Sequence, residues 1–207
     1  MAGCQAYQWA AQFPDMVKSI LPFCASAKTS IHNYVFLEGV KATLIADQNW
    51  NNGDYKSPPV AGLKAFGRVY AGWAFSQDFF RKELYKAIGF KTAEDLLNDW
   101  ESDHVKNWDA NNLLAKIDTW QTSDISIGPI YNNNFRKALE SIQARSILMP
   151  CNQDLYFRTK DNAIEANYIP KVSLRPYDSS FGHCAANPGY DKGFETELDK
   201  NISELLK

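Results

Sequence analysis

The chain has 207 residues, 45% of them hydrophobic and 14% aromatic, and a formal net charge of −2. This composition allows a sizeable core and excludes an intrinsically disordered protein, and no apolar stretch approaches the roughly 18 residues of a transmembrane helix. The 22 basic and 24 acidic residues include no basic run, so neither a nucleic acid nor a membrane is expected as a partner.

The hydrophobic pattern predicts a strand-containing region that is followed by a long helical one. The first region, about residues 3–27, indicates a helix over 5–13 that Pro14 stops, and then a short apolar strand in "MVKSILPFCAS". The middle region, roughly 28–135, has helical spacing at 31–45, about 62–87, 92–100 and 110–121. Segments rich in Asn, Gly and Pro, such as "QNWNNGDYKSPPVAG", are predicted to be loops.

The last region alternates strands and helices. It contains "ARSILMPC" as a strand, "RTKDNAIEANYI" as a helix, "KVSLRPYD" as a second strand and "GFETELDKNISELLK" as a final amphipathic helix. Such alternation is typical of a parallel sheet, so the predicted fold class is α/β, with a core of 1–27 and 136–207 and a helical insertion at 28–135. Three strands rarely make a self-sufficient parallel sheet, and we therefore expect part of the fold to be missing from this sequence.

The cysteines and histidines show no metal-binding pattern. No CxxC or HExxH occurs, so no metal and no cofactor is predicted, and the scattered thiols are expected to be buried in a reducing cytoplasm. The absence of a cationic leader followed by an apolar core also fits a cytoplasmic location. The residues concerned are Cys4, Cys24, Cys151, Cys184, His32, His104 and His183.

Two loops of the last region carry the residues best suited to catalysis. Asp154 comes just after one predicted strand and His183 just after the next, which is where open α/β sheets place their ligands. A carboxylate beside an imidazole can activate a nucleophile: Asp154 would fix the tautomer of His183, and His183 would take the proton. In the alternative reading, Asp154 caps the following helix and His183 is bonded to loop backbone.

The order of these features resembles the homoserine O-acetyltransferase-like branch of the α/β-hydrolase superfamily. The opening "MAGCQAYQWAAQFPDMV" is similar to the family segment S-M-G-G-x-Q-A-x-x-W-A…Y-P-D-x-V, which follows the nucleophile. Further segments resemble the lid helices of the family, its F-D-A-N-x-Y-L-x-x-x-x-A-x-D stretch, and its acid and histidine loops: "NYVFLEGVKATLIADQNWNNGDY", "PPVAGLKAFGRVYAG", "WDANNLLAKIDTWQTSDIS", "SILMPCNQDLYF" and "DSSFGHCAANPG". The resemblance covers essentially the whole chain and implies a partial α/β-hydrolase fold, with a short parallel sheet and a helical lid.

The resemblance also implies roles for individual residues. Asp154 and His183 match the triad acid and base, and Met1 matches the residue after the nucleophile, whose backbone N–H donates to the oxyanion hole. No glycine in the chain has a serine two positions later, so the G-x-S-x-G elbow is absent, and the expected serine would lie one position before Met1. Substitution by Cys4, Cys151 or Cys184 is the weaker alternative.

The lid departs from the acetyltransferase pattern. That family grips an amino-acid carboxylate with an arginine in a T-Y-R-S segment, whereas the corresponding stretch here is "GWAFSQDFF", with no arginine or lysine between Arg68 and Arg81. Trp73, Phe75 and Trp108 are candidates for an aromatic substrate pocket, and the alternative, which the sequence favours slightly, is that the lid aromatics form the core of the lid. Asp103 and His104 are expected in a solvated loop.

The sequence therefore predicts serine-based acyl transfer or ester or thioester hydrolysis in a longer form of the protein. A small acyl compound would be the substrate, with acyl-CoA a candidate co-substrate if the reaction is a transfer. This chain alone is expected to be inactive. The alternative is a non-catalytic homologue that binds or dimerises, and self-association through the lid helices is predicted in either case.

Overall fold

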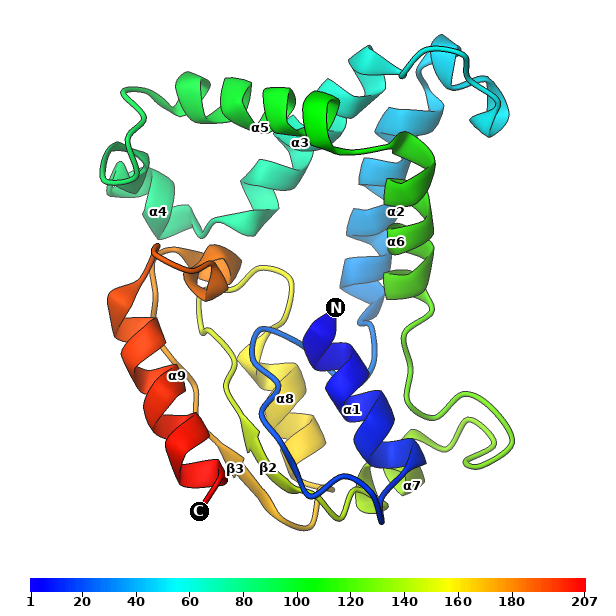
Figure 1. Cartoon of the computed structure of the whole chain (residues 1–207), viewed down its shortest axis with the longest axis vertical. Coiled ribbons are helices and arrows are strands. Elements are labelled where there is room, and N and C mark those ends of the chain that lie inside the picture. The colour runs from blue at the N-terminus through cyan, green and yellow to red at the C-terminus, as the bar shows by residue number, and fades with distance from the viewer. The chain divides into compact units, whose positions relative to one another are not determined.

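The computed structural model describes residues 1–207 and divides them into two units (Figure 1). The sheet unit comprises residues 1–28 and 123–207, and the lid unit comprises residues 29–122. The sheet unit contains α1 (Ala2–Gln12), β1 (Ser19–Ile20), α7 (Phe135–Glu140), β2 (Arg145–Leu148), α8 (Thr159–Ala166), β3 (Val172–Leu174), the 3-10 helix η3 (Gly182–Ala186) and α9 (Lys192–Leu205). The lid unit contains α2 (Ile31–Ile45), η1 (Gln48–Gly53), α3 (Val60–Ala74), α4 (Gln77–Arg81), η2 (Leu84–Lys86), α5 (Ala93–Asn107) and α6 (Ala110–Gln121).

The second unit boundary lies at 122/123 rather than at the predicted 135/136. The intervening loop belongs to the sheet unit because its polar groups are satisfied there. Asp124 forms an ion pair with Lys28 at 2.8 Å, and the N–H of Ile125 donates to the carbonyl of Ala27 at 3.2 Å. These contacts join residues that are far apart in the sequence, which the hydrophobic periodicity of the loop does not reveal.

The sheet has three parallel strands in the order β1-β2-β3. The strands are shorter than predicted, and beyond Ile20 and Leu148 the pairing continues only as the isolated bridges Phe23↔Met149 and Cys151↔Tyr177. Prolines account for this interruption, because a proline has no N–H to donate to a neighbouring strand. They are Pro22, Pro150 and Pro176, one after each strand.

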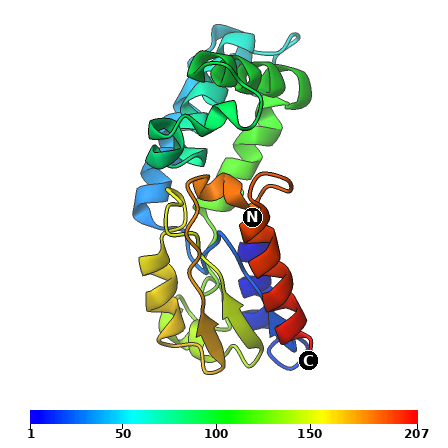
Figure 2. The same ribbon diagram turned by 90° about the vertical axis from the view of Figure 1, so that its left-hand side faces the viewer.

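Helices cover both faces of this sheet. Leu148 points into a core cluster with α1 and α7, whereas its neighbour Met149 packs on the other face against Phe194 of α9. This alternation follows from the two-residue period of a strand. Figure 2 shows α8, in yellow, and α9, in red, on opposite sides of the strands.

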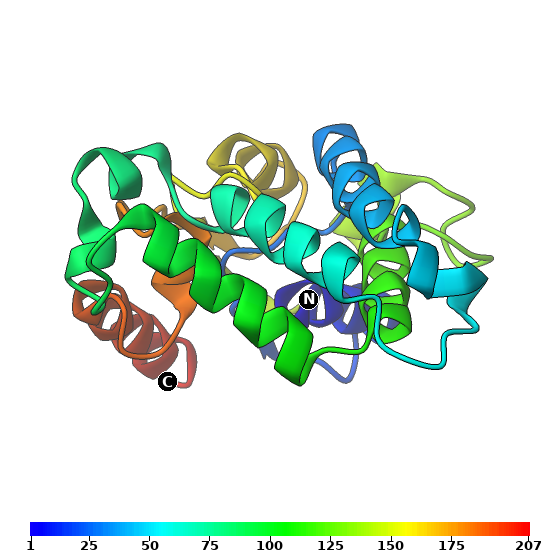
Figure 3. The ribbon, with the colours of Figure 1, turned by 90° about the horizontal axis from the view of Figure 1, so that it is seen from above.

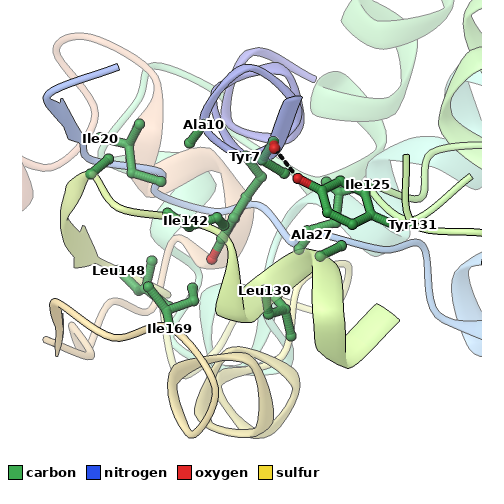
Figure 4. Packing of buried hydrophobic residues seen from close by; sticks show 13 residues of the cluster. Tyr7, Ala10, Ile20, Ala27, Ile125, Tyr131, Leu139, Ile142, Leu148 and Ile169 are labelled. Carbon is green, nitrogen blue, oxygen red and sulfur yellow. Dashed lines mark hydrogen bonds between the residues drawn. The ribbon is translucent and has the colours of Figure 1, made fainter. Parts of the chain in front are cut away.

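The main core of the sheet unit surrounds Tyr7. Its ring is fully buried among Ala10, Leu139, Ile142 and other residues of the cluster (Figure 4). The helix α1 is therefore buried along one side, whereas its apolar residues predict burial on more than one side. Its other side exposes Trp9, which is 56% exposed, and the residue after the helix, Phe13, is 42% exposed.

The lid unit is built from two helix pairs. In Figure 1, α2 lies beside α6, and Figure 3 shows α3 running alongside α5. The close approach of α3 and α5 depends on Gly67, where an added Cβ would lie 2.8 Å from the carbonyl oxygen of Trp100. No helix of the structure combines the length and apolar character that crossing a membrane requires.

Two helix predictions for the lid are corrected by the structure. The predicted helix over about 62–87 breaks at Phe75, because the Ser76 hydroxyl accepts from the N–H of Phe79 and caps a new helix, α4. The helix predicted at 92–100 continues to Asn107, so Asp103 and His104 are helical rather than loop residues. His104 is buried and bonded to the carbonyl of Trp100, and burial lowers the pKa of its imidazole.

Candidate functional site

The carboxyl ends of β2 and β3 bring Asp154 and His183 together. The Nδ1 atom of His183 lies 2.8 Å from Oδ2 of Asp154. The Asp154 side chain is completely buried, whereas 32% of the His183 side chain is exposed. Parallel neighbouring strands end at the same edge of a sheet, which is why residues 29 positions apart in the sequence meet here.

The carboxylate is held in place by backbone donors. Its Oδ1 atom accepts from the N–H of Tyr156 at 2.7 Å and from that of Phe157 at 3.2 Å. The N-cap of α8 is Arg158, which makes no side-chain cap bond, so Asp154 does not cap that helix. These bonds leave Oδ2 of Asp154 facing the imidazole. The alternative reading, in which His183 is bonded to loop backbone, is therefore wrong.

The bond to Asp154 determines the protonation pattern of the imidazole. An ionised carboxylate can only accept, so Nδ1 must carry the proton that it shares with Oδ2. In the neutral ring, Nε2 is then an acceptor, as a general base requires. The imidazole ring packs against the rings of Tyr156, in a T-shaped arrangement, and Phe157. The ring centroids are 4.9 Å and 5.6 Å from that of the imidazole, respectively.

The loop that carries His183 is tied to the loop that carries Asp154. Asn152 donates to Asp178 at 2.9 Å, and Gln153 accepts from the N–H of Ser179 at 2.8 Å. Gly182, directly before the histidine, has a φ of 63°, a left-handed conformation that glycine adopts without steric cost. The two loops thus hold each other in register.

Cys24 is a third site residue, which the sequence did not single out. It follows β1, and its Sγ, a carboxylate oxygen of Asp154 and a ring nitrogen of His183 all lie within 4.8 Å of one another. Burial, reinforced by the negative charge of Asp154, raises the pKa of the Cys24 thiol well above its usual value. The thiol is therefore protonated at neutral pH and is not an activated nucleophile.

The other cysteines show no sign of activation either. Burial raises the pKa of Cys151 to about 11 and that of Cys184 to about 12. Cys4 is buried within α1. All three match the predicted buried thiols, and no disulfide is present.

Met1 is the N-cap residue of α1, where backbone N–H groups have no partner within the helix. The next turn packs tightly: a Cβ on Gly3 would lie 2.4 Å from the Cβ of Ala25. This approach places the start of α1 against the segment that contains Cys24. The role of Met1 as an oxyanion-hole donor stays a prediction.

The lid aromatics occupy different environments. Phe75 is fully buried and stacks on Phe79 with centroids 4.0 Å apart, so its ring belongs to the core of the lid unit. Trp73 is partly exposed, and the centroid of its ring lies 4.6 Å from that of Phe36. The indole N–H of Trp108 donates to the carboxylate of Asp103 at 3.0 Å. The substrate-pocket role of Trp73, Phe75 and Trp108 stays a prediction.

Comparison with known proteins identifies close relatives of the chain, although no protein-family profile matches it. A probable esterase of Corynebacterium glutamicum is 30% identical over 209 residues, which cover 100% of this chain and 59% of the relative. An ethyl acetate hydrolase of Pseudomonas veronii is also 30% identical, over 208 residues, with the same coverage. A homoserine O-acetyltransferase of Trichormus variabilis is 26% identical over 89% of the chain and 52% of the relative.

Solved structures agree with these relatives. The acetyl esterase MekB matches 99% of this chain with a TM-score of 0.94 and 30% identity, over 59% of its own length. An acetylester hydrolase of Corynebacterium glutamicum matches with a TM-score of 0.92 and 29% identity, over 58% of its length. The chain thus spans somewhat more than half the length of these relatives.

Proposed function

The chain belongs to the α/β-hydrolase superfamily, in the branch of esterases and homoserine O-acetyltransferases, and we propose that it carries the acid and base of a serine esterase for short acyl esters. The observation that carries this proposal is the hydrogen bond between buried Asp154 and partly exposed His183 at the carboxyl edge of the sheet. A proton acceptor held in one tautomer beside a buried carboxylate has the chemistry that acyl transfer needs.

In the proposed reaction, His183 takes the proton of a serine hydroxyl at Nε2 as the oxygen attacks the ester carbonyl. The negative charge of Asp154 stabilises the imidazolium that forms. His183 then gives the proton to the departing alcohol, which leaves an acyl-serine. Water, deprotonated by the same nitrogen, hydrolyses that intermediate and releases the acid.

The attacking serine is proposed to lie in a part of the fold that these 207 residues do not span. Three observations support this. The chain holds no G-x-S-x-G sequence, and it matches only 59% of the length of its esterase relatives. In addition, β1 forms the edge of the sheet, and Trp9 of the adjacent α1 and Phe13 just after it are exposed, as expected where further strands and helices would pack.

Ester hydrolysis is favoured over transfer to homoserine. No arginine or lysine lies between Arg68 and Arg81, so that lid segment has no guanidinium to clamp an amino-acid carboxylate. The two relatives at 30% identity are described as a probable esterase and an ethyl acetate hydrolase. Transfer from acyl-CoA to a less polar acceptor remains the second candidate, because homoserine O-acetyltransferases share the fold.

The test joins this chain to the part of the Corynebacterium glutamicum esterase that precedes the aligned region, and measures hydrolysis of p-nitrophenyl acetate. Activity that falls by about 10³-fold or more in His183→Ala and Asp154→Asn variants is expected, since triad members act as a unit. A folded chimera whose activity is unchanged by His183→Ala would refute the assignment. The coding DNA upstream of Met1 offers a second test, because an in-frame glycine-x-serine is expected there.

The proposed partner is a small acyl ester, and the lid unit is also proposed to contact a second copy of the chain. The supporting observation is the helix α2, on which Ile31, Val35 and Ile45 are 79%, 63% and 45% exposed. The spacing of these three residues places them along one side of the helix.

A cytoplasmic location of the protein is also proposed, on the sequence evidence alone.

A further inference from the structure

Cys24 gives the acid–base pair a third neighbour of a different chemical kind. Each of the three strands β1, β2 and β3 is followed by one residue of the cluster: Cys24, Asp154 and His183. The sheet order therefore places a thiol, a carboxylate and an imidazole at one edge, with their ligand atoms within 4.8 Å of one another. A general base needs only the carboxylate and the imidazole, so the proposed esterase chemistry does not use the thiol.

We propose that Cys24, Asp154 and His183 form a binding site for a thiophilic divalent cation such as Zn²⁺. Thiolate sulfur, imidazole nitrogen and carboxylate oxygen are the three ligand types that Zn²⁺ takes in proteins. With metal–ligand distances of about 2.0–2.3 Å and tetrahedral angles, the ligand atoms would lie roughly 3.3–3.6 Å apart. The Asp154–His183 pair, at 2.8 Å, needs to open only slightly, and the thiol sulfur, which lies within 4.8 Å of both partner atoms, needs to move inward by at most about 1.5 Å.

The surroundings of the cluster favour this arrangement. The N–H groups of Tyr156 and Phe157 hold Oδ1 of Asp154 and so direct Oδ2 towards the other two ligands, as outer-sphere partners of metal sites do. The thiol and the carboxylate are buried, whereas the imidazole is partly exposed. The cation would enter from the imidazole side, where water could fill the fourth position.

Metal binding at this position would inhibit the base. The cation replaces the proton on Nδ1, the ring nitrogen that faces the carboxylate, and this proton moves to Nε2. The thiol proton leaves to solvent, since a coordinating thiol is deprotonated. With Nε2 protonated, His183 cannot accept a proton from a serine, so occupancy would stop the proposed reaction while the fold stays intact.

Direct binding to the 207-residue chain tests the site independently of any activity. The chain is titrated with Cd²⁺, and the thiolate-to-metal charge-transfer absorption in the ultraviolet is followed. One equivalent is expected to bind, and Cys24→Ser is expected to abolish the band. The same variant should weaken Zn²⁺ binding by at least about tenfold, because even the loss of an outer-sphere partner has that effect.

The matched control is Cys4→Ser, which removes another buried thiol and should leave the band unchanged. The His183→Gln variant should weaken binding as Cys24→Ser does. In NMR spectra, saturating Zn²⁺ should remove the downfield Nδ1–H signal of His183. A band that survives Cys24→Ser, or an Nδ1–H signal that persists at saturation, would overturn the metal site and leave the esterase proposal untouched.

Discussion

The sheet unit and the lid unit bury very different side chains. Both buried carboxylates of the protein, Asp154 and Glu165, lie in the sheet unit, where each accepts several hydrogen bonds. The lid unit buries stacked aromatic rings, such as Phe75 on Phe79, and its acidic groups stay at the surface in pairs such as Glu94 with Arg68. The buried carboxylates thus lie in the unit that contains the Asp154–His183 pair, whereas the lid unit holds stacked aromatic rings in its core.

The largest expected effect concerns the aromatic core of the lid unit. Phe75→Ala should lower the free energy of unfolding of that unit by about 3–5 kcal/mol, because it removes a fully buried ring and leaves a cavity. Phe13→Ala, at an exposed position of the sheet unit, should cost about 1 kcal/mol or less. Urea unfolding followed by near-ultraviolet circular dichroism measures both, and equal losses would show that Phe75 lines a surface pocket instead.

The second effect concerns the buried carboxyl of Glu165 in the sheet unit, because the acidic side chains of the lid unit lie nearer the surface. The Glu165 carboxyl accepts from the hydroxyl of Tyr7 at 2.9 Å and from the N–H of Ala27 at 2.8 Å, yet burial outweighs these bonds and raises its pKa to about 7. The folded state therefore holds the proton more tightly than the unfolded state. This stabilisation is complete below the unfolded pKa, near 4.5, and is lost as the pH rises through about 7.

The loss should amount to at most about 3 kcal/mol between pH 4.5 and pH 8. The difference in free energy of unfolding between wild type and Glu165→Gln, measured in urea across that range, isolates it. The matched control is Glu140→Gln, which makes the same substitution at the surface of the same unit. A wild-type curve parallel to that of Glu165→Gln would show that folding does not raise the pKa of the buried carboxyl.

A third prediction compares one glycine in a helix of each unit. Gly3→Ala should destabilise the protein by about 1–3 kcal/mol, because the new Cβ would meet Ala25 at 2.4 Å. Gly72→Ala in α3 meets nothing within 4 Å and should stabilise the lid unit by up to about 1 kcal/mol. Thermal unfolding of the two variants should thus shift in opposite directions, and a stabilising Gly3→Ala would contradict the tight packing of α1.

The smallest effect on stability is expected on the exposed side of α2. Val35→Asp should leave the unfolding free energy within about 0.5 kcal/mol of wild type, because the side chain is 63% exposed. It should nevertheless convert the proposed dimer to monomer, which light scattering after size exclusion would detect. A wild-type chain that is monomeric at high concentration would refute self-association through this helix.

The sequence predicted that Asp154 and His183 lie close together, because local rules are sufficient there, and it failed where backbone geometry decides. Asp154 and His183 each follow an apolar strand, and the shared edge of a parallel sheet brings such residues together. The sequence did not identify Cys24 as a site residue, because its position depends on the short strand β1 and on its own left-handed backbone conformation, with a φ of 45°. Neither feature can be predicted from the surrounding residues. The helix break at Ser76 was missed because apolar spacing continues across it, although the serine itself was a usable capping signal.

The central claim is that this chain holds an acid and a base of a serine esterase but not its nucleophile. Labelling with a fluorophosphonate probe, followed by mass spectrometry, tests it most directly. The 207-residue chain should remain unlabelled, whereas the chimera with the Corynebacterium glutamicum segment should be labelled on one serine of that segment, and His183→Ala should abolish this labelling. Labelling of the 207-residue chain itself that disappears in His183→Ala would contradict the account, because it would show that the nucleophile lies within these residues.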